Sequence, residues 1–331
     1  MCQISTILGV YNKDKTGASW LHINTGILLI VTLFSWSKPY ANPIGGRVVA
    51  GVAGIHQQGS NLDVNQASQR AVINWQSFNI DRNEQVNFNQ PNRQSSTLNR
   101  VMGDNPSALL GKMNANGNVY LVNQNGIMVG KDAEINVGSF IASTANISNK
   151  NFMAERMKFN QPGKPDAKII NQGNITVQQG GLVALVAPGV ENQGVINAKL
   201  GKINLASGDA YTLDFYGDNL VNFTISKEQL QNIADAQGKP LSRYVDNTGK
   251  ITAEGGLVAI SAQSGKAVLD SIINVGGHIQ AQSVGNQRGT INLAGGKSTG
   301  INVKGTIDAT SNETSGTGGK VEIRAGQIKL I

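Results

Sequence analysis

Short apolar runs separated by glycine and asparagine dominate the chain from residue 44 onward. Valine, isoleucine and leucine make up most of these runs, and the spacing typical of amphipathic helices is nearly absent. In Ile203-Asn204-Leu205-Ala206 apolar and polar residues alternate, which puts Ile203 and Leu205 on one face of a strand and Asn204 on the other. The pattern predicts a chain built mainly of β-strands.

Several of these runs are copies of one another. The copies that begin at Gly277 and Gly305 are 28 residues apart, and those that begin at Gly289 and Gly319 are 30 residues apart. One such copy is too small to bury its own apolar face, so the copies must stack. Stacked strands about 4.8 Å apart form a parallel β-helix, in which asparagines at equivalent positions bond up and down the stack. The copies fall into two groups: Gly194–Ala198, Gly277–Ala281 and Gly305–Ala309; and Gly201–Leu205, Gly289–Leu293 and Gly319–Ile323.

Two segments break the strand pattern and predict short helices that project from the coils. Residues 148–159 carry Phe152, Met153 and Met157 at helical spacing. Residues 226–234 begin with Ser226 and Gln229 in capping-box positions. Both helices are expected to cap or cover the solenoid rather than to bind a ligand.

The composition excludes some classes of protein. The chain has 40 glycines and 37 asparagines in 331 residues, which suits frequent turns. Aromatic residues are 5% and charged residues 15%, no run of three Lys or Arg occurs, and the net charge of +7 is spread widely. A nucleic-acid partner is therefore not expected. The single cysteine, Cys2, allows no internal disulfide and no thiolate metal site.

The N-terminus resembles an export signal. Residues 26–36 are uncharged and mostly apolar but too short to span a bilayer comfortably, and small and proline residues follow. We expect cleavage after Ala41; an uncleaved anchor is the alternative. Residues 1–41 would then be a signal peptide that directs the chain across the inner membrane.

Residues 98–159 carry a series of motifs in one order. Leu98-Asn99-Arg100-Val101 is followed by Asn105–Gly111, by Ala115-Asn116-Gly117, and by Val119–Ile127, which contains Asn123-Gln124-Asn125-Gly126. This series resembles the N-terminal two-partner secretion domain of filamentous haemagglutinin-like exoproteins. Segments upstream, including Trp75–Ile80, and Ser207-Gly208-Asp209 downstream are similar to the same family.

The resemblance implies an all-β fold, a right-handed parallel β-helix of the pectin-lyase-like kind with extra-helical strands and short helical insertions. It also implies a partner: a TpsB-type β-barrel transporter of the outer membrane, which recognises such domains through its periplasmic domains. The protein would be secreted or held at the surface of a Gram-negative bacterium. The passenger behind such a domain is usually an adhesin, which suggests host-cell glycans or receptors as further partners.

The residues expected to form the recognition and structural motif follow from the same resemblance. They are Leu98, Asn99, Arg100, Asn116, Gly117, Asn123, Gln124, Asn125, Gly126 and Ile127. One position departs from the family, whose tetrad is commonly Asn-Pro-Asn-Gly, because position 124 is glutamine here. Proline would fix φ near −65°, whereas Gln124 must find that conformation unaided. The family's second tetrad has only a poor counterpart, Gln90-Pro91-Asn92-Arg93.

An enzyme is the main alternative, since β-helices also carry polysaccharide lyases and hydrolases. Such enzymes need converging carboxylates, or carboxylates with a base. The nearest acidic cluster, Asp209, Asp214 and Asp218, falls in a family segment where turn roles are expected, and His56 and His278 lack metal-ligand spacing. We therefore expect no catalytic residues, metal or cofactor. A contact-dependent growth inhibition toxin is the other alternative for the full protein.

These observations predict three regions. Residues 1–41 form the signal peptide, 42–240 the secretion domain with its N-terminal cap, and 241–331 further coils that begin an adhesin-like passenger.

Overall fold

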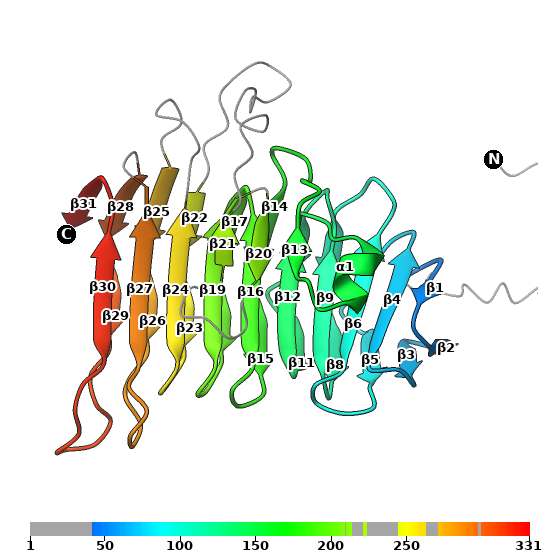
Figure 1. The fold of residues 1–331 in the computed structure, drawn as a ribbon, viewed down its shortest axis with the longest axis horizontal. Coiled ribbons are helices and arrows are strands. Elements are labelled where there is room, and N and C mark those ends of the chain that lie inside the picture. Colours follow the sequence, from blue (N-terminus) through cyan, green and yellow to red (C-terminus); the bar gives the residue numbers. More distant parts are fainter. Residues whose placement is uncertain (1–41, 209, 214–220, 224–243, 263–270, 297–298) are drawn as a thin grey trace, which may run out of the picture. The chain divides into compact units, whose positions relative to one another are not determined.

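Three long sheets make up the structure (Figure 1). The computed structural model describes residues 42–208, 210–213, 221–223, 244–262, 271–296 and 299–331, all within one compact unit, 40–331. The expected signal peptide, its cleavage site at Ala41 and the expected helix at 226–234 lie outside the described residues. Within the described part no helix is long and apolar enough to cross a membrane.

We name the three sheets I, II and III. In spatial order, sheet I contains β1 (Arg47–Ala50), β4 (Arg70–Trp75), β6 (Ser96–Val101), β9 (Asn118–Val122), β12 (Ser139–Ser143), β16 (Leu182–Ala187), β19 (Lys202–Ser207), β24 (Leu257–Ala262), β27 (Thr290–Gly295) and β30 (Lys320–Arg324). Sheet II contains β7 (Ser107–Leu109), β10 (Ile127–Val129), β14 (Lys168–Asn171), β17 (Gly189–Asn192), β22 (Tyr244–Asn247), β25 (Ser271–Val275), β28 (Thr299–Val303) and β31 (Gln327–Leu330). Sheet III contains β2 (Ala53–Gln58), β3 (Asn61–Gln66), β5 (Gln85–Asn89), β8 (Lys112–Ala115), β11 (Glu134–Val137), β15 (Asn174–Val177), β18 (Val195–Asn197), β23 (Lys250–Thr252), β26 (His278–Gln280) and β29 (Thr306–Asp308).

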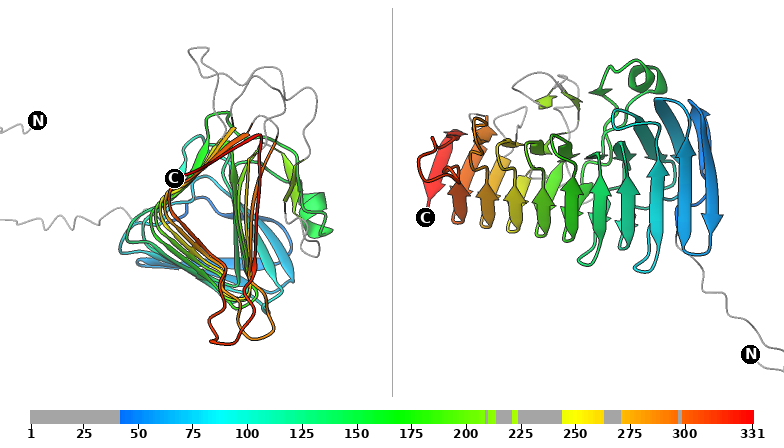
Figure 2. Two further views of the ribbon diagram at one scale, coloured as in Figure 1. Left: turned by 90° about the vertical axis from the view of Figure 1, so that its left-hand side faces the viewer. Right: turned by 90° about the horizontal axis from the view of Figure 1, so that it is seen from below.

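The chain visits the sheets in the order I, II, III and then I again. β9, β10, β11 and β12 complete one such coil, and β12 pairs in parallel with β9, with Ile141 beside Tyr120. Figure 2 shows the three faces when the stack is viewed along its length. The predicted parallel β-helix is confirmed, and the two groups of sequence repeats correspond to strands of sheet III and of sheet I.

The interior of the β-helix is a column of aliphatic side chains. Ile196, Ile251 and Ile279 occupy the same register position on successive strands of sheet III and are all fully buried. Ile203 and Leu205 point into the same interior, as the alternating pattern predicts. Burying each such side chain stabilises the fold by about 1.5–3 kcal/mol.

Glycines at two corners allow successive coils to approach each other. A Cβ atom on Gly194 would lie 2.2 Å from the carbonyl oxygen of Gly173, and a Cβ on Gly249 would lie 2.2 Å from that of Gly194. The corner between sheets III and I repeats this arrangement at Gly181 and Gly201. The recurring glycines are therefore required by close contact between coils.

The predicted asparagine ladder is present at the end of sheet II. The Nδ2 of Asn171 donates to Oδ1 of Asn192 at 2.8 Å, and the Nδ2 of Asn192 donates to Oδ1 of Asn247 at 2.7 Å. All three side chains are fully buried. Each amide thus satisfies its neighbour in the next coil, which removes the penalty for burying a polar group.

From β4 to β19, sheet I is largely buried on both faces, because a second apolar cluster lies on its outer side. The cover consists of α1 (Asn149–Met153) and a small antiparallel sheet of β13 (Lys158–Phe159), β20 (Tyr211–Leu213) and β21 (Val221–Phe223). Phe152 of α1 packs edge-on against Tyr120, with the two ring centroids 5.2 Å apart. Phe159 stacks on Tyr211, with the ring centroids 4.6 Å apart. These are the extra-helical strands and the helical insertion that were expected.

The helix predicted at 148–159 is shorter than expected. Ser148 caps it, with Oγ accepting from the backbone N–H of Asn151 at 3.2 Å. It ends after Met153 because Glu155 adopts a positive φ of 58°, which reverses the chain. Residues 154–157 turn the chain and Lys158–Phe159 form β13, so half of the predicted helix is wrong.

Candidate functional site: the corner at residues 123–126

The tetrad Asn123-Gln124-Asn125-Gly126 forms a tight turn between β9 and β10. The backbone N–H of Gly126 donates to the carbonyl oxygen of Asn123 at 3.1 Å, which closes the turn. β9 belongs to sheet I and β10 to sheet II, so the tetrad is a corner of the β-helix and not a hairpin.

Asn123 is the buried centre of this corner. Its Nδ2 donates to the carbonyl oxygen of Asn105 and to Oγ of Ser107, both at 3.0 Å. Its Oδ1 accepts from the backbone N–H of Asn125 at 2.9 Å and from the Nδ2 of the same residue at 3.0 Å. The side chain is fully buried. It therefore joins the turn to the preceding coil and also fixes the shape of the turn.

Gln124 fastens the corner to a loop that follows β13. Its Nε2 donates to the carbonyl oxygen of Pro162 at 2.7 Å, and its own carbonyl oxygen accepts from the backbone N–H of Lys164 at 2.8 Å. A proline at this position could not make the first of these bonds. Glutamine lacks the conformational restriction of proline, but its side chain bonds to Pro162, 38 residues farther along the chain.

Gly126 and Ile127 lead from the corner into sheet II. Gly126 has a φ of 117°, and a Cβ on it would lie 2.9 Å from the carbonyl oxygen of Lys168. Only glycine fits both conditions without strain. Ile127 points into the interior column, whereas Val122, on the other side of the turn, belongs to the outer cluster on sheet I. Both side chains are buried.

Asn116 and Gly117 lie at the other end of β9, away from the tetrad. Asn116 pairs with the backbone of Gln90: its Oδ1 accepts from the N–H at 2.8 Å and its Nδ2 donates to the carbonyl oxygen at 2.7 Å. The backbone N–H of Gly117 donates to Oε1 of Gln90 at 2.8 Å. These two residues form a corner between sheets III and I.

Leu98, Asn99 and Arg100 lie on β6, and all three are buried. Leu98 belongs to the outer cluster on sheet I. Oδ1 of Asn99 accepts from the indole N–H of Trp75 at 3.0 Å.

Arg100 connects the β-helix to the cover of sheet I. It donates to Oδ1 of Asn146 at 2.8 Å, of Asn149 at 2.8 Å and of Asn74 at 3.0 Å, and to the carbonyl oxygen of Ile147 at 2.6 Å. These recorded partners are all uncharged oxygens. Burial lowers the pKa of the Arg100 guanidinium, because nearby water is excluded.

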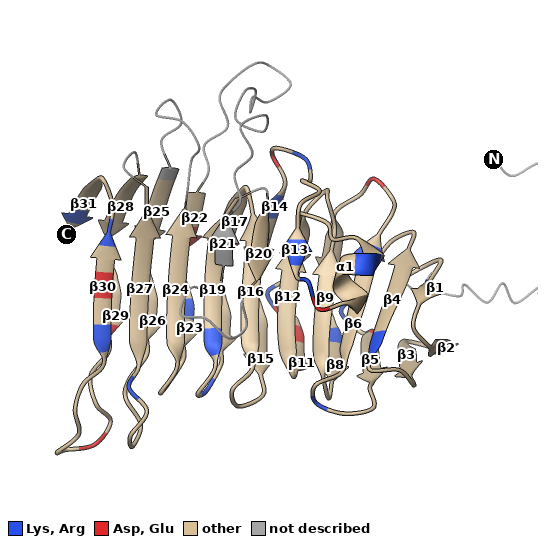
Figure 3. Cartoon of the chain, viewed as in Figure 1, with Lys and Arg blue, Asp and Glu red and all other residues tan. Residues whose placement is uncertain are grey.

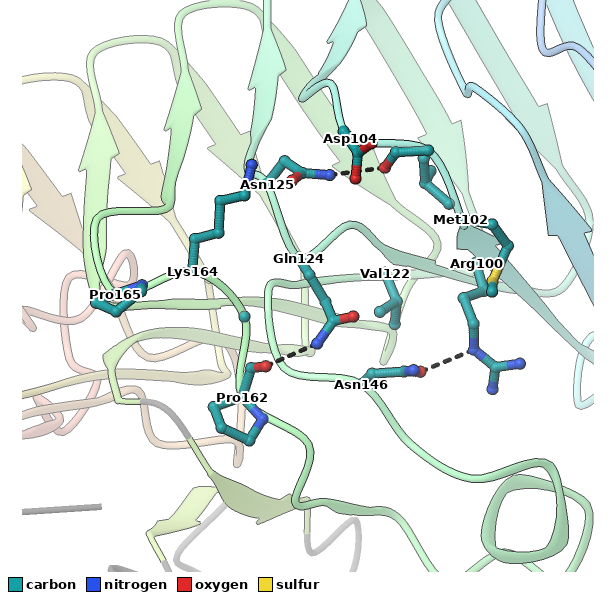
Figure 4. A pocket seen from close by; sticks show the side chains of 13 residues that line it. Arg100, Met102, Asp104, Val122, Gln124, Asn125, Asn146, Pro162, Lys164 and Pro165 are labelled. Atoms are coloured by element: carbon teal, nitrogen blue, oxygen red, sulfur yellow. Dashed lines mark hydrogen bonds between the residues drawn. The ribbon is translucent and has the colours of Figure 1, made fainter. Parts of the chain in front are cut away.

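A cavity of about 480 Å³ lies between Arg100 and the tetrad. Gln124, Asn125, Asn146 and Lys164 are among its lining residues. Figure 4 shows Gln124 bonded to Pro162 on one side of the cavity and Arg100 bonded to Asn146 on another. The structure thus brings Arg100, Gln124 and Asn125 to one surface, while Asn116 and Gly117 belong to another.

Sequence reasoning missed the role of two further residues. Gln90 was noted only as part of a poor tetrad, yet its Nε2 donates to Oγ1 of Thr97 at 3.0 Å and to the carbonyl oxygen of Asn118 at 3.1 Å. Asn146 was not singled out, although it binds Arg100. Their signal in the sequence is weak, since asparagine and glutamine are frequent throughout the chain.

The described residues offer little for catalysis. They contain no group of three His, Cys, Asp or Glu side chains that could hold a metal ion. His56 lies on β2 and His278 on β26, at distant positions in sheet III. Asp209, Asp214 and Asp218 lie outside the described residues. The geometry around the tetrad is that of a hydrogen-bonded structural corner with a cavity of mixed polar and apolar lining beside it.

Comparison with known proteins gives consistent matches. A family model described as the TPS secretion domain matches residues 41–323. Two curated proteins of Haemophilus influenzae, both described as heme/hemopexin-binding protein, are 32% identical over 285 and 299 residues, which cover 82% and 78% of this chain. The chain spans 30% of the length of each of these relatives. The crystal structure of the HMW1 secretion domain from Haemophilus influenzae superposes with a TM-score of 0.63 and 29% identity, over 87% of this chain and 84% of that one.

Proposed function

Because the chain belongs to the family of TPS secretion domains, we propose that residues 42 to about 240 are the export signal of a two-partner secretion system. Its partner would be an outer-membrane β-barrel transporter of the TpsB type, which binds the signal through periplasmic domains. Proteins of this family are secreted exoproteins of Gram-negative bacteria. The observation that carries the proposal is the family match over residues 41–323 on a β-helix with the tetrad at a coil corner.

The mechanism we propose is strand addition. A chain that is still unfolded in the periplasm presents amphipathic segments, such as Lys202–Ser207, to the open sheet edges of the transporter's periplasmic domains. Outside the cell the chain folds coil by coil, and each added coil buries apolar surface on the previous one. Folding outside the outer membrane would then bias the movement of the chain through the transporter in the outward direction.

The passenger function is a separate part of the proposal. We propose that coils from residue 241 onward begin an adhesin-like passenger, displayed at the cell surface or released. The relatives' name refers to heme and hemopexin, but this chain spans only 30% of their length, and the family model of the secretion domain matches residues 41–323 of it. The alignment therefore supports a shared export route more strongly than a shared ligand.

A deletion tests the export signal. Removing residues 44–160 while keeping the leader takes away the tetrad, Arg100 and the first coils. We expect this variant to stay in the periplasm, measured by immunoblotting of periplasmic and culture fractions. A control that lacks residues 271–331 keeps the whole proposed signal and should still be exported. Normal release of the first variant would contradict the proposal.

A further inference from the structure

The outer face of sheet III carries one polar side chain per coil in an unbroken column. The column runs over nine strands, from Asp63 on β3 to Asp308 on β29, with each residue paired in register to the next. The seven residues between these two ends are all uncharged: Asn87, Asn114, Asn136, Thr176, Asn197, Thr252 and Gln280.

Hydrogen bonding divides this column into two parts. At its N-terminal end the Nδ2 of Asn87 donates to Asp63 at 2.8 Å and the Nδ2 of Asn114 donates to Asn87 at 3.1 Å. Farther along, the side chains of Asn136, Thr176, Asn197 and Gln280 have no recorded hydrogen bond to described residues. Asn136 and Thr176 are exposed, and the other two are half-buried. These amides and hydroxyls remain able to bind something outside the chain.

The face is open and has little net charge. Sheet I is covered from β4 to β19 by α1 and the small sheet, whereas the polar column on sheet III is exposed or half-buried along its length. In the adjacent column Lys112 and Glu134 form an ion pair at 3.0 Å. Figure 3 colours the charged residues on the ribbon, and they are few along the strands, with both signs present. A polyanion would need an excess of cations, which this face does not provide.

A shallow groove runs beside the column. It has a volume of about 470 Å³, and its lining includes Asn87, Asn114, Asn116, Asn136 and Gln178. Amide groups therefore line the groove from several coils at once. Because an amide offers both a donor and an acceptor, such a surface can match a ligand that carries both kinds of group.

We propose that the outer face of sheet III binds an extended, uncharged polysaccharide that lies along the stack. The coils rise by about 4.8 Å, which is close to the length of one sugar ring in an extended chain. Successive rings would then meet equivalent amide and hydroxyl groups, and sugar hydroxyls would donate to and accept from them. This activity belongs to the folded protein outside the cell, so it is independent of the proposed export signal.

Three substitutions test the face without disturbing the core. The variant N136A/T176A/N197A removes side chains that make no hydrogen bond to another described residue. The control N274A/N302A removes an amide pair, 3.0 Å apart, from the outer face of sheet II. The purified, folded chain would be titrated calorimetrically with a β-1,4-glucan, a galactomannan and dextran, and with heparin as the polyanion. Thermal unfolding of each variant shows whether it is folded.

We expect at least one neutral polysaccharide to bind, and the triple variant to bind it about tenfold more weakly or worse while the control binds normally. Affinity should also rise with the number of sugar rings until the ligand spans the exposed part of the column. Preference for heparin would overturn the proposal. So would the absence of binding to all three neutral polymers, or equal binding by the folded triple variant.

Discussion

Asn123 stabilises the corner because it satisfies four hydrogen bonds where water cannot reach. Replacing it with alanine would leave Ser107 and the backbone groups of residues 105 and 125 without these partners. We expect Asn123→Ala to lower the free energy of unfolding by roughly 2–3 kcal/mol, measured by denaturant titration. Asn105→Ala is the matched control, since its recorded bond uses only the backbone, and it should change stability by less than about 0.5 kcal/mol.

Gln124 can be tested by comparison with the residue that the family prefers. Gln124→Ala loses the bond to Pro162 and should lower the free energy of unfolding by roughly 0.5–1.5 kcal/mol. Gln124→Pro loses the same bond, but proline restricts the unfolded chain. At a compatible turn position this restriction raises the free energy of unfolding by about 0.4–1 kcal/mol. Chemical denaturation should therefore rank the proline variant above the alanine variant. The opposite order would show that this corner does not have the conformation that proline requires.

At this scale the family resemblance supplied a set of motif residues, and the structure supplies the contacts that they make. The partners of Arg100 did not follow, because Asn146 and Asn149 are 46 and 49 residues away and resemble every other asparagine in the chain. Contacts of this range depend on how the cover folds back onto sheet I.

The corner glycines provide a prediction at the level of the coil. Gly194→Ala would place a Cβ 2.2 Å from a backbone oxygen that has no room to move, so we expect a loss of roughly 3 kcal/mol in the free energy of unfolding. Gly300→Ala is the control, because a Cβ on Gly300 would meet no atom within 4 Å. Thermal unfolding should separate the two variants clearly. Similar thermal unfolding midpoints for the two variants would mean that adjacent coils can move apart with little loss of stability.

Repeating elements were predictable from the sequence, whereas the cover of sheet I was predictable in kind, as extra-helical strands and a short helix, but not in its bounds. Strands of sheets I and III recur with glycine at the same place, so their stacking could be inferred from the sequence alone. The six consecutive buried residues of β16 could not be assigned faces, because a continuous apolar run has no alternation. Its outer side is buried by the cluster to which Phe159 and Tyr211 belong. The early end of α1 likewise depends on Glu155, whose backbone conformation is unusual for a residue other than glycine.

At the scale of the whole molecule, the absence of cysteine after Cys2 fits the proposed passage of an extended chain, without cross-links, through the transporter. Each coil bonds mainly to its two neighbours, so stability accumulates coil by coil and needs no covalent bond. A cross-link between adjacent coils should leave the folded β-helix intact but obstruct the passage of an extended chain. Gln172 and Gln193 are suitable positions, since both are exposed and their side chains meet at 3.1 Å.

We expect the double variant Q172C/Q193C to be exported poorly when the periplasm is oxidising and normally when a reductant is added, because the disulfide closes a loop that cannot be fully extended. The single variants Q172C and Q193C are the controls and should be exported normally in both conditions. Export would be measured as the ratio of secreted to periplasmic protein, and non-reducing electrophoresis would confirm the disulfide. If the cross-linked chain were secreted as efficiently as the single variants, the transporter would have to admit looped or folded coils, and the strand-addition mechanism would be wrong.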